Sequence, residues 1–405
     1  MGFRVARNWP DSGADKTLKD DAVEALLTNH TLIVGQSRSG KTQAARRILE
    51  EVLLWTDARV VVLDPNADFR FLTQPDPKNH EVRTGTFRDS WKQVVAGIRV
   101  AGQRPRLPWG IAWGELSQEE MAAFLGLRPK DHFSDYRHLV RHIRYERNKR
   151  SPSKFRRMTL DEFVRSGYFE IAAGEELERY RLLLDELLGL RVWATSSETL
   201  DSLVTAGHRA VVVDLSMDDE RVRLMAAARV LGALWRLGES TRTKRLTGRR
   251  ATSTPWPGTV VLIDEAHMFA PSDTPEPQKQ LLRERIERFA DQGKKFNLVL
   301  MLVTQQPDKL HRRILSECGN RIVLRMNERL SLGVLEQIYG GLKGRYDGSL
   351  TFEPSRGYGL IEGAVLCDEI PPPPMPRPIQ FYLSRTREGG ATPAKTWARP
   401  KPSLP

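Results

Sequence analysis

The stretch Gly35-Gln36-Ser37-Arg38-Ser39-Gly40-Lys41-Thr42 has the spacing of a P-loop, a glycine-rich turn that can surround the phosphates of a nucleotide. Directly before it, Thr31-Leu32-Ile33-Val34 is a short apolar run that predicts a buried strand. Directly after it, the segment from Lys41 to Trp55 alternates apolar and charged residues at helical spacing. The motif requires the order strand, glycine-rich turn, helix, so we predict an α/β fold built around this turn.

This geometry predicts a site for ATP and Mg²⁺. The backbone N–H groups of such a loop point inward around a polyphosphate, and the start of the helix adds the positive end of its dipole. Lys41 is expected to reach the β- and γ-phosphates, and the Thr42 hydroxyl is expected to ligate Mg²⁺. The expected nucleotide-binding residues are Gly35, Gln36, Ser37, Arg38, Ser39, Gly40, Lys41 and Thr42.

A second strand is expected far downstream, over residues 259–263, and it ends in the adjacent carboxylates Asp264 and Glu265. Its continuous β-branched and aliphatic composition is typical of a strand that is buried on both faces of a parallel sheet. At the carboxyl end of such a strand, Asp264 is expected to hold the hydration shell of Mg²⁺. Glu265 is the expected catalytic base, which orients and deprotonates the water that attacks the γ-phosphate.

A third apolar run, residues 297–303, ends at Thr304-Gln305-Gln306-Pro307. A polar side chain at the end of a strand beside the acidic strand can sense the γ-phosphate or hold the attacking water, as glutamines do in other NTPases. Gln305 is our candidate for that role.

Several segments follow the P-loop in a characteristic order. They are Leu63-Asp64-Pro65-Asn66-Ala67-Asp68-Phe69, Ile263-Asp264-Glu265-Ala266-His267, Gly293-Lys294-Lys295-Phe296, Thr304-Gln305-Gln306-Pro307 and Ile314-Leu315-Ser316-Glu317-Cys318-Gly319-Asn320-Arg321-Ile322-Val323-Leu324-Arg325. The Gln-x-Pro turn followed by Ser-x-Cys-x-Asn and a strand is the most specific of these signals. Over about residues 31 to 365, the chain therefore resembles the HerA branch of the HerA/FtsK ATPases.

The resemblance implies a RecA-like core that assembles into a homohexameric ring, binds ATP between subunits and pumps duplex DNA through a central channel. It also implies that a basic residue of one subunit completes the nucleotide site of its neighbour. The family usually has Gly-Arg-Lys where this chain has Gly293-Lys294-Lys295, and a lysine keeps the charge but not the planar fork of arginine. Lys294 and Arg321 are the candidates for this catalytic residue, with Arg325 as a further alternative.

The length of 405 residues exceeds the size at which a single core usually stops growing. We predict an α/β fold with a RecA-like P-loop NTPase core, a mostly parallel sheet and a helical insertion. The expected parts are an N-terminal lead (1–30), the first half of the core (31–115), the helical insertion (116–205), the second half of the core (206–370) and a Pro-rich, disordered tail (371–405).

The chain is basic, with a net charge of +12, which favours a polyanionic partner such as duplex DNA. Within the insertion, arginines recur at three- and four-residue intervals on one helical face: Arg137, Arg141, Arg144 and Arg147. This stripe suits a phosphate backbone and is equally typical of a solvated helix face. Further on, a helix from about Glu220 to Leu237 is expected to precede a mobile basic loop from Arg242 to Arg250.

Only two cysteines occur, Cys318 and Cys367, so neither a disulfide framework nor a cysteine-rich zinc site is expected. The first ten residues contain no apolar signal core, and no stretch of 18 or more apolar residues occurs. The sequence therefore predicts a cytoplasmic protein without a membrane segment.

Parts of the sequence also fit three other functions. A DEAH-box helicase is suggested by Asp264-Glu265-Ala266-His267 alone, but nothing after residue 325 is long enough for the second RecA-like domain it needs. A conjugative or phage DNA-pumping ATPase would use the same core. A nucleotide-gated ring could instead organise a partner, such as a nuclease or a defence effector, in DNA processing or anti-phage defence. The 30 residues before the first strand are too few for the family's usual N-terminal β-barrel, which keeps this scaffold role open.

Overall fold

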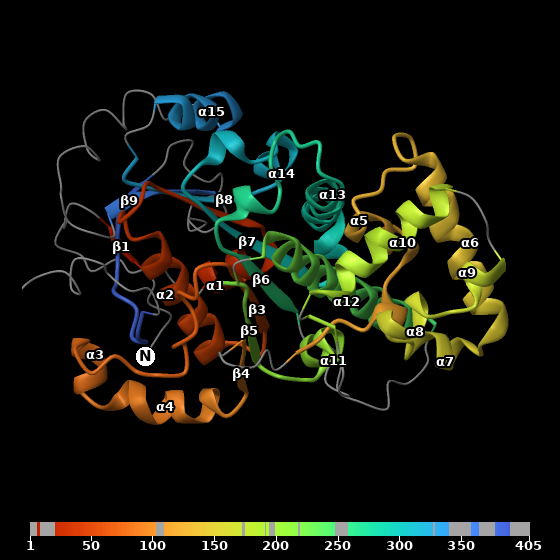
Figure 1. Cartoon of the computed structure of the whole chain (residues 1–405). Helices are drawn as coiled ribbons and strands as arrows, with labels where there is room; N and C mark the ends of the chain where they lie inside the picture. The colour runs from red at the N-terminus through yellow and green to blue at the C-terminus, as the bar shows by residue number, and fades with distance from the viewer. Residues whose placement is uncertain are drawn as a thin grey trace, which may run out of the picture.

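One mostly parallel β-sheet forms the centre of the fold (Figure 1). The computed structural model describes residues 6–8, 21–102, 109–171, 175–190, 192–193, 199–217, 219–247, 258–326, 329–339, 358–363 and 377–388. Within these residues the strands are β1 (Ala6–Asn8), β2 (Thr31–Val34), β3 (Arg59–Asp64), β4 (Ile98–Ala101), β5 (Ala210–Asp214), β6 (Thr259–Ile263), β7 (Leu298–Thr304), β8 (Asn320–Leu324), β9 (Tyr358–Gly363) and β10 (Arg377–Phe381). Their order across the sheet is β1-β10-β9-β8-β2-β7-β6-β3-β5-β4.

The strands from β8 to β4 run parallel, and β9, β10 and β1 extend the sheet through antiparallel pairs. Every residue of β2, β3, β5, β6 and β7 is buried, as expected for apolar strands that are covered on both faces. The predicted α/β fold with a mostly parallel sheet is confirmed. Because parallel strands end at the same edge, the segments that follow β2, β3, β6 and β7 meet there.

Helices cover both faces of this sheet (Figure 1). The α-helices are α1 (Asp21–Thr28), α2 (Lys41–Trp55), α3 (His80–Arg83), α4 (Thr86–Val95), α5 (Gln118–Phe124), α6 (Phe133–Lys149), α7 (Pro152–Arg156), α8 (Leu160–Val164), α9 (Tyr168–Ile171), α10 (Glu175–Leu188), α11 (Leu200–Thr205), α12 (Glu220–Leu246), α13 (Pro277–Gln292), α14 (Arg312–Ser316) and α15 (Arg329–Tyr339). Short 3₁₀ turns are η1 (Trp113–Glu115), η2 (Ala266–Met268), η3 (Gly293–Phe296) and η4 (Pro307–Lys309). Val60 and Val62 of β3 share an apolar core with α2, whereas Val61 and Leu63 share the other core with α12 and α13.

The segment between β4 and β5 contains α5 to α11 and forms a helical lobe beside the sheet (Figure 1). Its interior is aromatic, with the ring of Trp113 centred 5.4 Å from that of Phe163. His142 is fully buried among these rings, and its Nε2 lies 2.6 Å from Ser166 Oγ. Burial lowers the pKa of His142 to about 3, so this imidazole is neutral inside the lobe.

His30 joins the start of β2 to the neighbouring elements. Its Nδ1 accepts a hydrogen bond from the Leu300 N–H at 2.9 Å, and its Nε2 therefore donates to the Ala290 carbonyl at 2.9 Å. This arrangement requires the neutral imidazole, because a proton on Nδ1 would face the Leu300 N–H. Burial and the nearby Lys294 lower the pKa of His30 to about 4.

We expect the free energy of unfolding to fall as the pH drops from 6.5 toward 4. The folded-state pKa of His30 lies below the unfolded value of 6.5, so the unfolded chain takes up the proton first. Each such histidine contributes a slope of up to about 1.4 kcal/mol per pH unit in that window, and His142 acts in the same direction. Urea unfolding at several pH values should show a flatter slope for His30→Gln. The exposed control His80→Gln should keep the wild-type slope, and an unchanged slope in His30→Gln would contradict the assignment.

Helix α12 is longer than the sequence predicts, since it continues from Glu220 to Leu246. Arg242 anchors the additional turns, because its guanidinium stacks over the Phe296 ring at 5.4 Å and donates to the Lys295 carbonyl at 3.2 Å. The prediction of a mobile basic loop is therefore wrong for residues 242–246, and residues 248–257 lie outside the described part. No helix in the described part of the chain is both long and apolar enough to span a membrane.

The prediction of a disordered tail from residue 371 is wrong for residues 377–388. Strand β10 pairs with β9 and with β1, so the predicted N-terminal lead also contributes a strand to the sheet. Residues 384–388 then pack along α2, where the buried Glu50 carboxylate accepts hydrogen bonds from the N–H groups of Arg385 and Thr386, each at 2.9 Å. Residues 384–388 are polar but ordered, because they bind the buried Glu50 carboxylate, which lies far away in the sequence. Residues 371–376 and 389–405 lie outside the described residues.

Candidate nucleotide-binding site

The loop between β2 and α2 has the shape of a phosphate cradle. Arg38 adopts a φ of 64° and Gly40 a φ of 102°, both in the left-handed region. At Gly35, a Cβ atom would lie 2.4 Å from Ser39 Oγ and 2.9 Å from Leu324 Cβ, so only glycine fits. The buried Ser39 Oγ has no hydrogen-bond partner among the described residues. A close-packed loop with an unpaired buried hydroxyl is suited to bind phosphate oxygens.

Lys41 begins α2 at this loop and is buried, with 7% of the residue exposed. Its Nζ donates a hydrogen bond to the Gln36 carbonyl at 3.0 Å. Burial lowers the pKa of Lys41, and the nearby carboxylates of Glu265, Asp264 and Asp68 act in the opposite direction. The lysine therefore lies between the loop and the acidic end of β6, where it can contact a phosphate bound in the loop.

Asp264 follows β6 and is buried beside other carboxylates. Its pKa is raised well above the usual value, first by burial and then by the charges of Glu265, Asp64 and Asp68. Asp64, at the end of β3, accepts hydrogen bonds from the N–H groups of Asp68 and Phe69, yet burial raises its pKa to about 7. A bound cation would relieve the repulsion among these groups, as the assignment of Asp264 to Mg²⁺ requires.

Asp68 is a residue of the site that our sequence reasoning did not assign. Its carboxylate accepts a hydrogen bond from the side chain of Thr42, and burial raises its pKa. The preceding Ala67 has a φ of 58°, which turns the chain back toward Asp64. The signal in the sequence was the pair of carboxylates in Asp64-Pro65-Asn66-Ala67-Asp68, directly after a buried strand.

These residues suit a magnesium ion that is shared with phosphates. Within the described residues, no group of three or more His, Cys, Asp or Glu side chains is arranged to hold a metal on its own. Mg²⁺ at Thr42 and Asp264 would therefore also need oxygen atoms from phosphates and water, which is how this ion is usually bound beside nucleotides.

Glu265 occupies a strained position at the start of η2, with a φ of 46°. Its Oε2 is buried and has no hydrogen-bond partner among the described residues, while the backbone N–H of Gln305 donates to the carboxylate. Burial raises the pKa of Glu265, which strengthens it as a base. His267 Nδ1 lies 3.4 Å from Oε2, but burial and Lys309 lower the pKa of His267 to about 4, so this imidazole is neutral.

Gln305 lies where the sequence places it, since β7 pairs with both β6 and β2. The edge of the sheet thus brings together the loop, Lys41, the acidic pair and Gln305. Gln305 contacts Glu265 through its backbone N–H. The side chain of Gln305 is half-buried and can therefore contact a bound ligand.

The candidate trans residues lie away from this edge. Lys294 is exposed in η3, before β7, and Arg321 lies near the amino end of β8, where it pairs with Glu362 at 3.1 Å. Both positions are at the end of the sheet opposite to the P-loop of the same chain. Arg325 instead follows β8 at the P-loop edge, and its carbonyl accepts a hydrogen bond from the Gln36 N–H at 2.9 Å. Lys294 and Arg321 therefore cannot reach the P-loop of their own chain.

The arginine stripe lies on the outer face of α6. Arg137, Arg141, Arg144 and Arg147 are exposed. The opposite face of the helix is buried and includes Leu139 and His142. The four side chains are therefore accessible to a large polyanion.

The chain is similar to proteins that act on DNA. The family model described as "Helicase HerA, central domain" matches residues 21–264. The DNA double-strand break repair helicase HerA of Pyrococcus furiosus is 24% identical over 360 residues, which cover 80% of this chain and 63% of the relative. The protein of the same description from Sulfurisphaera tokodaii is 26% identical over 152 residues, which cover 38% of this chain and 27% of that relative. The chain thus spans less than two thirds of the length of these relatives.

Solved structures share the fold. VirB4 of Thermoanaerobacter pseudethanolicus has a TM-score of 0.62 at 16% identity, with 98% of each chain covered. The plasmid coupling protein TrwB, in complex with a non-hydrolysable GTP analogue, has a TM-score of 0.57 at 12% identity, with 96% of this chain and 91% of that chain covered. At such identities the likeness concerns the fold alone. The matched family model, in contrast, covers more than half of the sequence, and on this ground the chain belongs to the HerA helicase family.

Proposed function

We propose that this chain is an ATPase that hydrolyses ATP with Mg²⁺ and moves duplex DNA through a ring of subunits. The observation that carries the proposal is the meeting of Lys41, Asp264, Glu265 and Gln305 with the P-loop at one edge of the sheet. Membership of the HerA helicase family supports the coupling to DNA.

Hydrolysis follows from the positions of these side chains. A water beside Glu265 attacks the γ-phosphorus, and its proton passes to the free Oε2 of that carboxylate. The bond between the γ-phosphorus and the bridging oxygen breaks, and ADP leaves with the electron pair. Lys41 balances the charge on the phosphate oxygens, and Gln305 holds the water in line. Mg²⁺, when bound by Thr42 and Asp264, supplies further neutralisation of the phosphate charge.

The ring is proposed because Lys294 and Arg321, the two candidate trans residues, lie at the end of the sheet away from the P-loop of their own chain. Lys294 is the preferred trans residue, since Arg321 is already paired with Glu362. Subunits arranged head to tail would place Lys294 of one copy at the P-loop of the next, and a closed ring is the natural result of such heterologous contacts. We propose six subunits by analogy with the family.

Mixing inactive variants tests the ring. Lys41→Ala lacks the phosphate lysine and Lys294→Ala lacks the trans lysine, so each protein alone should hydrolyse ATP poorly. Mixed rings contain some interfaces with an intact P-loop and an intact Lys294, and these should restore partial ATPase activity. Lys295→Ala, which removes the exposed neighbouring charge, should retain activity by itself. Full ATPase activity of a monomer, measured with light scattering at micromolar concentration, would contradict the proposal.

Duplex DNA is expected to bind the arginine stripe and to stimulate ATP hydrolysis. Contacts to phosphates release counterions, so affinity should fall steeply with salt and vary little with DNA sequence. Replacing Arg137, Arg141, Arg144 and Arg147 with alanine should flatten the log–log salt slope by roughly one unit per arginine. A charge-matched control replaces four exposed positions outside the insertion, namely Arg83, Arg88, Lys92 and Arg312. Equal salt slopes for the stripe variant and the wild type would show that the stripe is only a solvated face.

Measuring ATP hydrolysis during the same DNA titration distinguishes a protein that moves DNA from one that only organises a partner. If duplex DNA does not stimulate the wild-type ATPase, a nucleotide-gated ring that organises a partner nuclease or defence effector becomes the better proposal. If DNA stimulates hydrolysis and the stripe variant loses the stimulation, movement of DNA is supported.

A further inference from the structure

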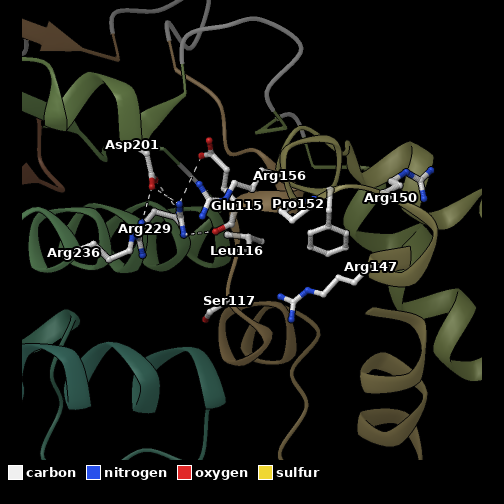
Figure 2. Close-up of a pocket in the computed structure, with 12 residues that line it drawn as sticks. Glu115, Leu116, Ser117, Arg147, Arg150, Pro152, Arg156, Asp201, Arg229 and Arg236 are labelled. Carbon is white, nitrogen blue, oxygen red and sulfur yellow. Dashed lines mark hydrogen bonds and ion pairs between the residues drawn. The ribbon is translucent and has the colours of Figure 1, made fainter. Parts of the chain in front are cut away.

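A second polar cavity lies between the helical lobe and α12, away from the P-loop (Figure 2). Its volume is about 560 Å³, which falls in the range of small-molecule sites. Five arginines and two acidic residues line it: Arg147, Arg150, Arg156, Arg229, Arg236, Glu115 and Asp201. A cavity with such an excess of positive charge is suited to an anion.

The floor of this cavity is electrically balanced. Arg229, Arg236, Glu115 and Asp201 line it, and Glu120 and Arg285 lie behind them in the same network of ion pairs. Arg229 is almost fully buried and donates to Glu120 at 2.9 Å and to both oxygens of Asp201. Arg236 donates to Asp201 at 2.7 Å, and Arg285 donates to Glu120 at 2.8 Å. These ion pairs hold the side chains in place, and their charges cancel, so this part of the cavity has no net charge that would attract an anion.

The uncompensated charges lie on the lobe side of the cavity. Arg150 pairs with Glu146, and Figure 2 shows its guanidinium turned away from the other side chains. Arg147 extends toward Ser117 and stacks over the Phe155 ring at 5.0 Å. Arg156 reaches toward Glu115, whose pKa is affected by its charge, but neither Arg147 nor Arg156 has an ion pair among the described residues. The cavity therefore presents two guanidinium groups that form no ion pair within the described part of the chain.

We propose that this cavity binds a phosphate monoester through Arg147 and Arg156. A phosphate monoester carries close to two negative charges at neutral pH, which matches the two unpaired guanidinium groups. Its three terminal oxygens can accept charge-assisted hydrogen bonds from both arginines, and the Ser117 hydroxyl offers a further donor on the facing loop. The phosphate can come from the 5′ end of a DNA strand or from a free mononucleotide.

The phosphate site in the cavity is distinct from the arginine stripe that we propose to bind DNA along its backbone. Arg137, Arg141 and Arg144 precede Arg147 on α6, but they do not line the cavity. Each internal phosphodiester of DNA carries one negative charge and should bind to any arginine of the stripe. A terminal phosphate monoester carries close to two charges and should bind preferentially to the two cavity arginines. Binding of the 5′ phosphate of DNA rests on the proposed function, whereas binding of a free mononucleotide does not.

The experiment compares two duplexes that differ only at one 5′ end, which bears a phosphate or a hydroxyl group. Binding to the full chain is followed by fluorescence anisotropy with a label at the far end. We expect the phosphorylated end to bind about tenfold more tightly. The double variant Arg147→Gln/Arg156→Gln should lose this ratio. The matched double variant Arg137→Gln/Arg141→Gln should weaken both duplexes alike and keep the ratio.

A second experiment tests binding of a free mononucleotide, with AMP as the probe and calorimetry as the measurement. It uses the Lys41→Ala protein, so that AMP binding at the P-loop does not contribute to the signal. AMP binding that is abolished by adding Arg147→Gln/Arg156→Gln supports the site even if the duplexes show no preference or do not bind. Two results would overturn the proposal. One is a 5′-phosphate preference that both double variants lose equally. The other is the absence of any preference together with AMP binding that is absent or insensitive to the cavity variant.

Discussion

Replacing Glu265 with glutamine is expected to slow ATP turnover by at least about 100-fold while ATP still binds. The amide has the size and shape of the carboxylate, so it can keep the hydrogen bond from the Gln305 N–H. It cannot accept the proton of the attacking water, because the buried Oε2 position then no longer holds a basic oxygen. Steady-state phosphate release measures the turnover, and a fluorescent ATP analogue measures binding.

The matched control is Glu284→Gln, which makes the same chemical change at an exposed position of α13. Its turnover should equal that of the wild type. If Glu265→Gln hydrolyses ATP at the wild-type rate, Glu265 is not the base and the proposed mechanism fails. If the variant loses ATP binding as well, Glu265 acts in holding the nucleotide rather than in the chemical step.

Replacing Lys41 with alanine is expected to weaken ATP binding by about 10- to 100-fold, with loss of turnover. Lys41 is the buried cation at the loop, and three carboxylates lie close to it. Without the Lys41 ammonium group, the carboxylates of Asp68, Asp264 and Glu265 repel the phosphates more strongly, and this repulsion adds to the lost hydrogen bonds. Equilibrium titration with the fluorescent analogue in the presence of Mg²⁺ gives the affinity.

Lys78→Ala serves as the control for this substitution, because Lys78 is an exposed lysine outside the site. Circular dichroism should show that both variants are folded. Wild-type affinity in folded Lys41→Ala would mean that the loop does not hold the phosphates as proposed.

The central part of the candidate site could be predicted from local sequence. The P-loop, the buried strand before it and the helix after it are contiguous, so their pattern contains the geometry that the structure shows. The acidic pair and Gln305 could also be placed, because each directly follows an apolar strand, and the carboxyl ends of parallel strands share one edge. Residues outside such local patterns could not be placed in this way. Asp68 joins the site through its hydrogen bond from the Thr42 side chain, although the two residues come from different elements.

The sequence by itself determined the α/β class, the P-loop and the residues at the strand ends, since hydrophobic periodicity and turn chemistry act over short distances. Only the tertiary structure decided that residues 384–388 bind Glu50 of α2, that α12 continues along Phe296, and that Arg229 joins Glu120 to Asp201. A polar segment predicts a loop when it is read alone. Its order depends on a buried partner that folding brings from hundreds of residues away, and no local pattern records that partner.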